Sequence, residues 1–234
     1  MIKMKLSFQP NLSCFDRKRG LNLPEVMSED LAEFLGILTG DGCINKYVRG
    51  RRVDYWISIT GHSIDDKKYF EDRLTPLYKR LLNLNVKIDK LKGQKTIRIT
   101  TRSKGLFNFL KDIGMNIGPK DNIVIPRVVM ENKKFLLFFF KGLVDTDGTL
   151  YLRNGIYPVL SIKQKSKGII VQVEKLLRQF GFSPCVDYNI IRIDKRGFIS
   201  IGHRLYLNGR KNLVHWLKLI GFGNPKHKTK CTIN

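Results

Sequence analysis

Two aspartates stand at the ends of two similar segments of this 234-residue chain. The segments read Phe34-Leu-Gly-Ile-Leu-Thr-Gly-Asp41-Gly42 and Phe140-Lys-Gly-Leu-Val-Asp-Thr-Asp147-Gly148. Each is an apolar helical pattern that ends in an acid and a glycine. If the two helices pack side by side, the carboxylates of Asp41 and Asp147 come together at the same end of the pair. Two carboxylates at one point form a candidate site for a divalent metal ion.

The spacing of small residues favours such packing. Gly36 and Gly40 in the first segment, like Gly142 and Thr146 in the second, are four positions apart and share one helix face. Small side chains on one face let another backbone approach closely. Asp145, within the second segment, is interpreted as a structural residue of the helix end and not as a metal ligand.

The first helix has a recognisable start and stop. Ser28 is a hydroxyl cap, and Glu29 and Asp30 place acids in the first turn, where the helix dipole favours them. Gly42 is expected to end the helix as a C-terminal glycine. Before it, residues 1–27 carry Pro10, Gly20, Pro24 and a basic cluster, which predicts an extended basic arm.

The rest of the first half, residues 28–127, predicts a regular order of elements. Val53, Tyr55, Ile57 and Ile59 alternate with polar residues as in a half-buried strand, and the basic turn 48–52 closes its hairpin. A helix over about 64–84, a second hairpin at 86–91 and 96–101, and a helix at 104–113 ended by Gly114 follow. The order is helix, two strands, helix, two strands, helix.

The second half, residues 128–234, repeats this order. It predicts helices at 134–147, 169–180 and 212–219, with hairpins at 149–153 and 157–163 and at 185–194 and 198–207. Pro119-Lys120 and Pro225-Lys226 follow the two aspartates at equal spacing. The halves are therefore predicted to be the same fold twice, related by a pseudo-two-fold axis.

The charge of the chain indicates a polyanionic partner. Lys and Arg total 43 against 20 Asp and Glu, a formal net charge of +23. Nucleic acid is favoured over an anionic membrane surface, because the basic residues do not line one face of an amphipathic helix. The cysteines, at positions 14, 43, 185 and 231, show no zinc or disulfide spacing, and the apolar run 135–140 is too short to span a bilayer.

Over about residues 28–230 these motifs resemble the LAGLIDADG homing endonucleases, in the form that carries both copies on one chain. The resemblance implies an α+β fold of two pseudo-symmetric αββαββα halves. Each half would contribute a curved four-stranded antiparallel sheet to a saddle over DNA, and the halves would join through a two-helix interface. By the same likeness, Asp41 and Asp147 bind the metal with the carbonyls of Gly40 and Thr146.

The resemblance also implies further catalytic residues. Gln164 matches a glutamine that positions water, whereas its counterpart in the first half is Gly61, which has no side chain. Lys120 and Lys226 match a basic residue near the metals that could neutralise the scissile phosphate. The chain would be a monomer that uses Mg²⁺, with Mn²⁺ able to substitute and Ca²⁺ able to bind without supporting cleavage.

The strand residues that alternate with the inward set are expected to contact double-stranded DNA. A β-ribbon fits the major groove, where arginine can pair with guanine. The expected base-facing residues are Asp54, Trp56, Ser58, Thr60, Arg98, Thr100, Ser161, Lys163, Arg204 and Tyr206. Arg49, Arg51 and Arg52 in the turn are expected to contact phosphates.

The function implied is a sequence-specific endonuclease that makes staggered double-strand breaks with 3′ overhangs in a long, asymmetric DNA site. Two alternatives remain: an RNA-binding intron maturase that uses the same basic saddle, and a catalytically dead transcription regulator, which would carry an additional DNA-binding domain. Retention of both aspartates favours cleavage. The protein is expected to be intracellular and soluble, in a prokaryotic cytoplasm or an organelle, encoded in an intron or free-standing.

Overall fold

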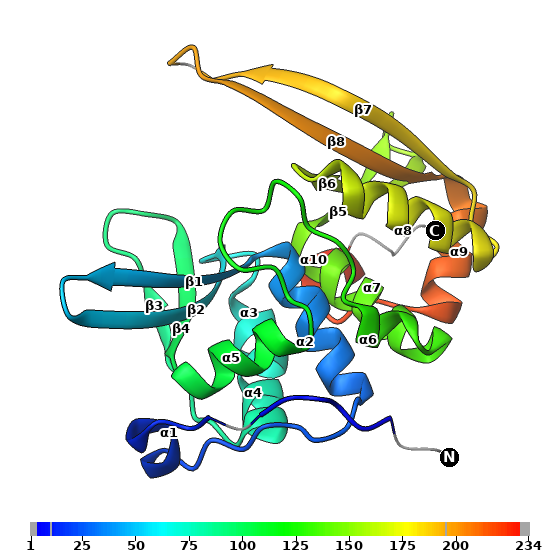
Figure 1. The fold of residues 1–234 in the computed structure, drawn as a ribbon. Helices are drawn as coiled ribbons and strands as arrows, with labels where there is room; N and C mark the ends of the chain where they lie inside the picture. Colours follow the sequence, from blue (N-terminus) through cyan, green and yellow to red (C-terminus); the bar gives the residue numbers. More distant parts are fainter. Residues whose placement is uncertain (1–3, 10, 195, 230–234) are drawn as a thin grey trace.

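A computed structural model of the chain describes residues 4–9, 11–194 and 196–229. Pro10 and Cys231 lie outside the described residues. Two central helices, α2 and α7, lie side by side, and a four-stranded sheet stands on each side of the pair (Figure 1). This is the α+β architecture of two similar halves that the sequence predicted.

The first half follows the predicted order of elements. Its first helix is capped by Ser28, whose hydroxyl accepts a hydrogen bond from the Leu31 backbone N–H at 3.2 Å. The helix predicted over about 64–84 is continuous but contains one turn of π-helix, η1. The elements are α2 (Glu29–Gly40), β1 (Gly42–Arg49), β2 (Arg52–His62), α3 (Lys67–Tyr69), η1 (Phe70–Leu74), α4 (Thr75–Leu82), β3 (Ile88–Lys90), β4 (Thr96–Arg102) and α5 (Lys104–Asp112).

The second half repeats the pattern with longer outer strands, and two short helices add to the prediction. Its central helix is capped by Asn132, whose side-chain oxygen accepts from the Lys134 N–H at 2.8 Å. The elements are α6 (Arg127–Met130), α7 (Lys133–Asp147), β5 (Gly148–Arg153), β6 (Tyr157–Gln164), α8 (Lys167–Gln179), β7 (Pro184–Ile193), β8 (Ile199–Asn208), α9 (Gly209–Leu219) and α10 (Pro225–Lys228).

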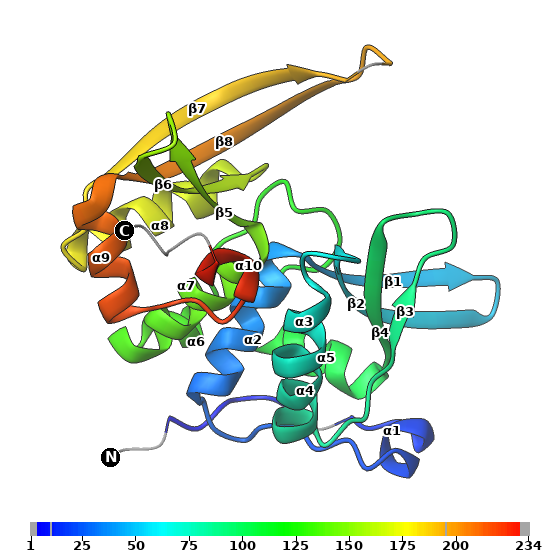
Figure 2. The same cartoon turned by 180° about the vertical axis from the view of Figure 1, so that it is seen from behind.

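The two sheets have the same topology. Their strand orders are β1-β2-β4-β3 and β5-β6-β8-β7, with antiparallel pairing throughout. Ser58 on β2 lies opposite Thr100 on β4, and Ser161 on β6 lies opposite Tyr206 on β8. From behind, β7 and β8 form a long hairpin that projects beyond the helices (Figure 2).

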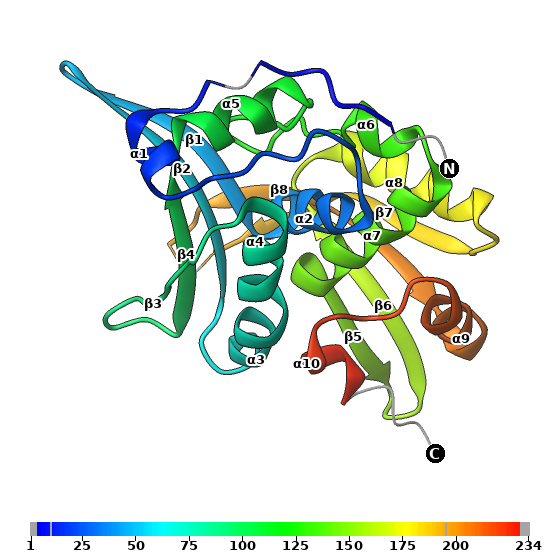
Figure 3. The same cartoon turned by 90° about the horizontal axis from the view of Figure 1, so that it is seen from below.

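The helix pair at the centre is packed through its small residues. A β-carbon at Gly36 would lie 2.1 Å from the Phe139 carbonyl oxygen, and one at Gly142 would lie 2.2 Å from the Glu33 carbonyl oxygen. The two backbones are therefore in direct contact (Figure 3). Glu33 is completely buried between the helices, where it pairs with Arg73 and, at 3.4 Å, with Lys141 of α7.

The expected extended basic arm is only partly correct, because the segment contains the short helix α1 (Cys14–Lys18) and packs on the first half. Leu6, Leu21, Leu23 and Met27 are buried in the common core. Four apolar side chains need a surface to cover them, so the segment folds back against the domain.

Gly42 follows Asp41, the C-cap of α2, so the helix ends where the sequence predicted, but Gly42 does not adopt the left-handed conformation common at such glycines. Positive φ angles occur at Gly114, Gly181 and Gly221, but not at Gly42 or Gly148. Instead, a β-carbon at Gly42 would lie 2.4 Å from the Leu38 carbonyl oxygen. Glycine is needed here because the chain turns from helix into strand against the last turn of its own helix.

Candidate metal centre and nucleic-acid interface

The helix pair brings Asp41 and Asp147 to the same place. Asp41 follows the last residue of α2, and Asp147 is the last residue of α7. A β-carbon at Gly40 would lie 2.0 Å from Thr146 Oγ1 and 3.4 Å from Asp147 Oδ2. The helices are thus in contact up to their final turns, and both half-buried carboxylates lie at that end.

The two carboxylates are electrostatically unfavourable without a compensating cation. Burial and the nearby charge of Asp41 raise the pKa of Asp147 to about 7. Burial also raises the pKa of Asp41, and Lys226 is the charged neighbour that opposes this most strongly, ahead of Lys120. Their position at helix C-termini, where the dipole is negative, adds to the cost.

Lys120 and Lys226, which lie near the C-terminal ends of the two halves, both extend to the C-terminal ends of α2 and α7. Lys120 Nζ donates to the Thr39 carbonyl oxygen at 2.9 Å and to the Gly40 carbonyl oxygen. Lys226 Nζ donates to the Thr146 carbonyl oxygen at 3.5 Å. Each lysine therefore contacts one of the two carbonyls that the family resemblance implies as metal ligands.

Gln164 holds one of the two acids. Its Nε2 donates to Asp147 Oδ2. Gln164, Asp147 and Lys120 line a common cavity of about 370 Å³. The cavity continues onto the inner face of the second sheet, which is the face that carries Lys163 and is turned away from the helices. The first half has no such group, since a β-carbon at Gly61 would lie 2.6 Å from the Phe70 ring.

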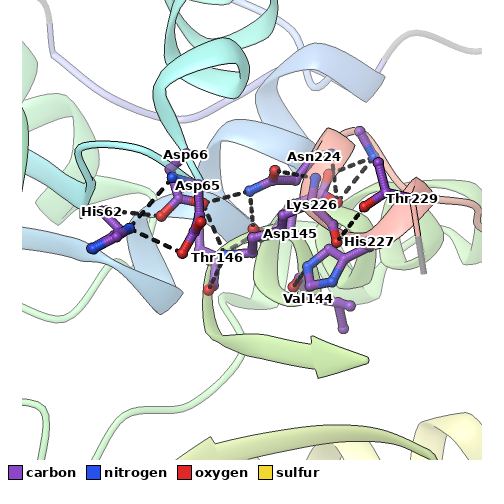
Figure 4. Close-up of polar contacts among 12 residues, drawn as sticks. His62, Asp65, Asp66, Val144, Asp145, Thr146, Asn224, Lys226, His227 and Thr229 are labelled. Atoms are coloured by element: carbon purple, nitrogen blue, oxygen red, sulfur yellow. Dashed lines mark hydrogen bonds and ion pairs between the residues drawn. The ribbon is translucent and has the colours of Figure 1, made fainter. Parts of the chain in front are cut away.

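Sequence reasoning missed two polar residues of this site, Asp66 and Asn224, which Figure 4 shows beside Asp145 and Lys226. Asp66 Oδ1 accepts from Lys226 Nζ at 2.9 Å and from Asn224 Nδ2 at 2.8 Å. Asn224 Nδ2 also donates to the Asp145 carbonyl oxygen at 2.9 Å. No sequence signal distinguished Asp66, because an Asp-Asp-Lys-Lys run is typical of an exposed helix start.

Asp145 is a structural residue, as predicted. Its carboxylate accepts from the backbone N–H groups of Gly223 and Asn224 at 2.8–3.0 Å. Burial raises its pKa to about 7 despite these bonds. The side chain anchors the C-terminal segment to the end of α7.

The oxygen donors at the helix ends fit a hard divalent cation such as Mg²⁺ or Ca²⁺. They comprise two carboxylates with raised pKa values and two carbonyls that already face positive charge. Within residues 4–9, 11–194 and 196–229, no three His, Cys, Asp or Glu side chains gather at one point. Ligands for a metal would therefore include main-chain oxygens.

The inner face of the first sheet carries an aromatic residue between two arginines. The guanidinium groups of Arg98 and Arg102 lie 5.2 and 5.1 Å from the centre of the Trp56 ring. Arg102 also pairs with Asp54 at 3.3 Å. These side chains line a hollow of about 1050 Å³ together with Arg49 and Arg52 of the exposed turn.

The second sheet has a related arrangement. The Arg204 guanidinium lies 5.4 Å from the Tyr206 ring centre and donates to its hydroxyl at 3.1 Å. Arg98 and Arg204 occupy matching positions in the two halves, and the Nε of each is buried without a hydrogen-bond partner among the described residues. Lys163 is exposed next to Arg204 on the neighbouring strand.

Some of the expected DNA-facing residues are placed differently. Ser58 and Ser161 lie on the inner face, but each is only 3% exposed, and Ser58 accepts a hydrogen bond from Trp56 Nε1 at 2.9 Å. The Thr60 hydroxyl is turned toward the Asp41 carbonyl oxygen at 3.5 Å. Val53, predicted to face the core of the first half, is 43% exposed. The β1–β2 hairpin extends past the helices that cover the sheet, so these helices leave Val53 uncovered there (Figure 1).

Among the described residues, no helix has both the length and the apolar character needed to cross a bilayer.

Comparison with known proteins agrees with this fold. Residues 134–221 match the family model described as a LAGLIDADG-like domain. Homing endonuclease I-DmoI of Desulfurococcus mucosus is 26% identical over 188 residues, covering 79% of this chain and 84% of that protein. The solved structure of I-DmoI in complex with DNA and Ca aligns with a TM-score of 0.61 at 22% identity, covering 82% of this chain and 88% of the other.

Other relatives are longer than this chain. An uncharacterized protein of Methanocaldococcus jannaschii is 26% identical over 167 residues, and the match covers 70% of this chain and 57% of that protein. The matches to a probable translation initiation factor of the same organism and to a DNA polymerase of Thermococcus kodakarensis span only 17% and 13% of those proteins.

The matched family model lies within the second half of the chain, and across both halves the chain is similar in sequence and in fold to homing endonuclease I-DmoI.

Proposed function

We propose that this chain is a sequence-specific, divalent-metal-dependent DNA endonuclease that makes staggered double-strand breaks with 3′ overhangs in a long, asymmetric site. The observation that carries the proposal is the meeting of Asp41 and Asp147 at the end of the helix pair, between two sheets with basic inner faces. One acid from each half provides one cleavage centre for each DNA strand.

The acids, carbonyls and lysines divide the chemistry between them. Asp41 and Asp147, with the carbonyls of Gly40 and Thr146, would hold divalent cations. When bound, such cations supply Lewis-acid polarisation of the phosphate and lower the pKa of a bound water. The ammonium groups of Lys120 and Lys226 offset the charge that develops on the scissile phosphates. Gln164 holds the Asp147 carboxylate and can orient an attacking water.

Related proteins support both the metal and the partner. Solved structures of I-DmoI contain DNA with Ca or with Mn. The oxygen donors of this chain suit the same hard cations. We propose Mg²⁺ as the working ion, with Mn²⁺ as a substitute and Ca²⁺ as an ion that permits binding without cleavage.

The two inner sheet faces would read different DNA half-sites. Arg98 with Trp56 in the first half and Arg204 with Tyr206 in the second present cationic, stacked side chains to the groove. Asp54, Thr100 and Lys163 complete the proposed base-facing set, whereas the turn residues Arg49, Arg51 and Arg52 would contact phosphates. Because the halves carry different side chains, the site is expected to be asymmetric.

The test is cleavage of a randomised plasmid library, with sequencing of the broken ends. In Mg²⁺ the protein should cut a single long site on both strands and leave 3′ overhangs, and EDTA should abolish the breaks. Asp41→Asn and Asp147→Asn should each abolish double-strand cleavage while retaining DNA binding. Asp112→Asn removes an equivalent charge from an exposed position at the end of α5 and should cut like the unchanged protein.

Breaks that persist in EDTA, or at full rate in either aspartate variant, would overturn the metal and carboxylate assignment. A protein that binds structured RNA tightly and cuts no DNA in the library would instead support the maturase alternative.

A further inference from the structure

The two halves build their cleavage centres from different residues. Asp147, Gln164 and Lys120 surround one cavity. At the other acid, the Thr60 N–H donates to the Asp41 carbonyl oxygen at 3.2 Å, and the next residue, Gly61, packs against Asp66, which pairs with Lys226. Each centre therefore combines an acid from one half with the lysine that ends the other half, but only one of them contains a glutamine.

Asp66 is placed as an internal partner of Lys226. It lies just before α3 in the first half, whereas Lys226 lies in α10 at the end of the second (Figure 4). The ion pair is 2.9 Å long, and its side chains are 9% exposed for Asp66 and 21% exposed for Lys226. The His62 backbone N–H, at 2.8 Å, and Asn224 Nδ2 also donate to Asp66, so its carboxylate is fixed in position.

The first half has no space for a second Gln164. The Phe70 ring and the Asp66 Cβ lie 2.6 and 3.1 Å from the position of a β-carbon at Gly61. In the place of a glutamine, the first half has the carboxylate of Asp66. Gln164 bonds the acid Asp147, whereas Asp66 bonds the lysine Lys226. Lys120, in contrast, has only main-chain oxygens as hydrogen-bond acceptors among the described residues.

We infer that Asp66 is a positioning residue that holds the Lys226 ammonium beside Asp41, and that the two DNA strands are cut by differently built centres. One consists of Asp41, Lys226 and Asp66, and the other of Asp147, Lys120 and Gln164. This inference rests on the proposed function. A lysine has a flexible four-carbon stem, so a fixed carboxylate is needed to keep its charge at one point near a phosphate.

The test measures cleavage of each strand separately on a plasmid that carries the site recovered from the library, with the two strands labelled differently. Asp66→Asn should slow one strand by roughly 10- to 100-fold, the usual effect of losing a supporting partner, so that nicked plasmid accumulates. Gln164→Ala should slow the opposite strand. Asp65→Asn removes the adjacent charge, which pairs with His62 at 2.9 Å and not with Lys226, and should leave both strands unchanged.

A double-mutant cycle separates positioning from general damage to the fold. Asp66→Asn, Lys226→Ala and the double variant are compared by strand-specific rate and, in EDTA, by the midpoint of chemical unfolding. Residues that act through one contact give non-additive effects, so the double variant should cut little more slowly than Lys226→Ala alone. Lys226→Ala leaves the bonds of Asp66 to His62 and Asn224 in place, so it keeps the test valid if Asp66→Asn folds poorly.

Equal slowing of both strands by Asp66→Asn, or additive effects in the cycle, would overturn the inference while leaving the endonuclease function standing. If the unchanged protein cuts no DNA, the proposed function and this inference both fail.

Discussion

Gly36 lies directly against the backbone of Phe139, so close that a β-carbon would come within 2.1 Å of the Phe139 carbonyl oxygen. This contact sets the separation of α2 and α7, and with it the meeting of Asp41 and Asp147 at their ends. The two helices cannot separate without disrupting the cores of both halves.

Gly36→Ala should therefore destabilise the protein by about 2–4 kcal/mol, because the added methyl must push the two backbones apart. Chemical denaturation monitored by circular dichroism measures the loss. Gly168→Ala, in helix α8, is the matched control, since its β-carbon would lie at an ordinary contact distance, 3.4 Å, from the nearest atom, the Ile123 carbonyl oxygen. The control should be neutral or slightly stabilising. Equal stability of Gly36→Ala and the unchanged protein would contradict the close packing.

Asp147→Asn should stabilise the metal-free protein above about pH 4. The folded pKa of Asp147, about 7, is higher than the unfolded value near 3.9. A raised folded pKa gives stability at low pH that is lost as the pH rises through about 7. The neutral amide avoids this loss, so the advantage of the variant in EDTA should grow between pH 4 and pH 7. Thermal unfolding across this range measures it, and a pH-independent difference would contradict the raised pKa that burial and the neighbouring Asp41 give to Asp147.

Arg98 and Arg51 should affect DNA binding in different ways. Arg98→Ala should cost about 1–3 kcal/mol on the recovered site but little on unrelated DNA, because this guanidinium, stacked on Trp56, is proposed to read a base. Arg51→Ala, in the exposed turn, should weaken binding to both sequences and reduce the log-log salt slope by about 1. Binding titrations in Ca²⁺ at several salt concentrations distinguish the two. Identical behaviour of the variants would mean that Arg98 contacts only the DNA backbone.

Asp16→Asn should loosen the N-terminal segment and destabilise the protein by roughly 1.5–3 kcal/mol at neutral pH, the usual value for hydrogen bonds to a charged group. Burial of Asp16 opposes ionisation, but hydrogen bonds from Ser103, Ser13 and the Gly105 N–H outweigh it and lower the pKa of the carboxyl. An amide has one acceptor oxygen, so its NH2 group would face either the backbone donors of Ser13 and Gly105 or the guanidinium of Arg19.

The pH dependence of this effect has a definite sign. Because the folded pKa of Asp16 is lowered, its stabilisation is complete above the unfolded pKa, near 3.9, and is lost as the pH falls through the folded pKa. The difference in the free energy of unfolding between Asp16→Asn and the unchanged protein should therefore become smaller below about pH 4. Urea unfolding at pH 3 and pH 7 checks this, with Asp112→Asn as the exposed control. A gap that widens in acid would contradict the assignment.

The sequence by itself determined the repeated halves, the helix pair and the two acids at its ends. These features depend on local rules: small residues four apart mark a packing face, caps mark helix starts, and alternation marks strands. A repeated motif at matched spacing carries the same local information twice, which is why the predicted element order agrees with both sheets.

Only the tertiary structure decided how the surroundings of Asp41 and Asp147 differ. Asp66 and Lys226 are far apart in the sequence and belong to different halves, and nothing local marks their ion pair. Position 61 is glycine because the Phe70 ring occupies the space that a side chain would need. Ser58 and Ser161 are buried by neighbouring residues, and the N-terminal segment folds back because its apolar side chains pack into the core. Pairing across the symmetry axis depends on the packing of both halves, so local pattern cannot contain it.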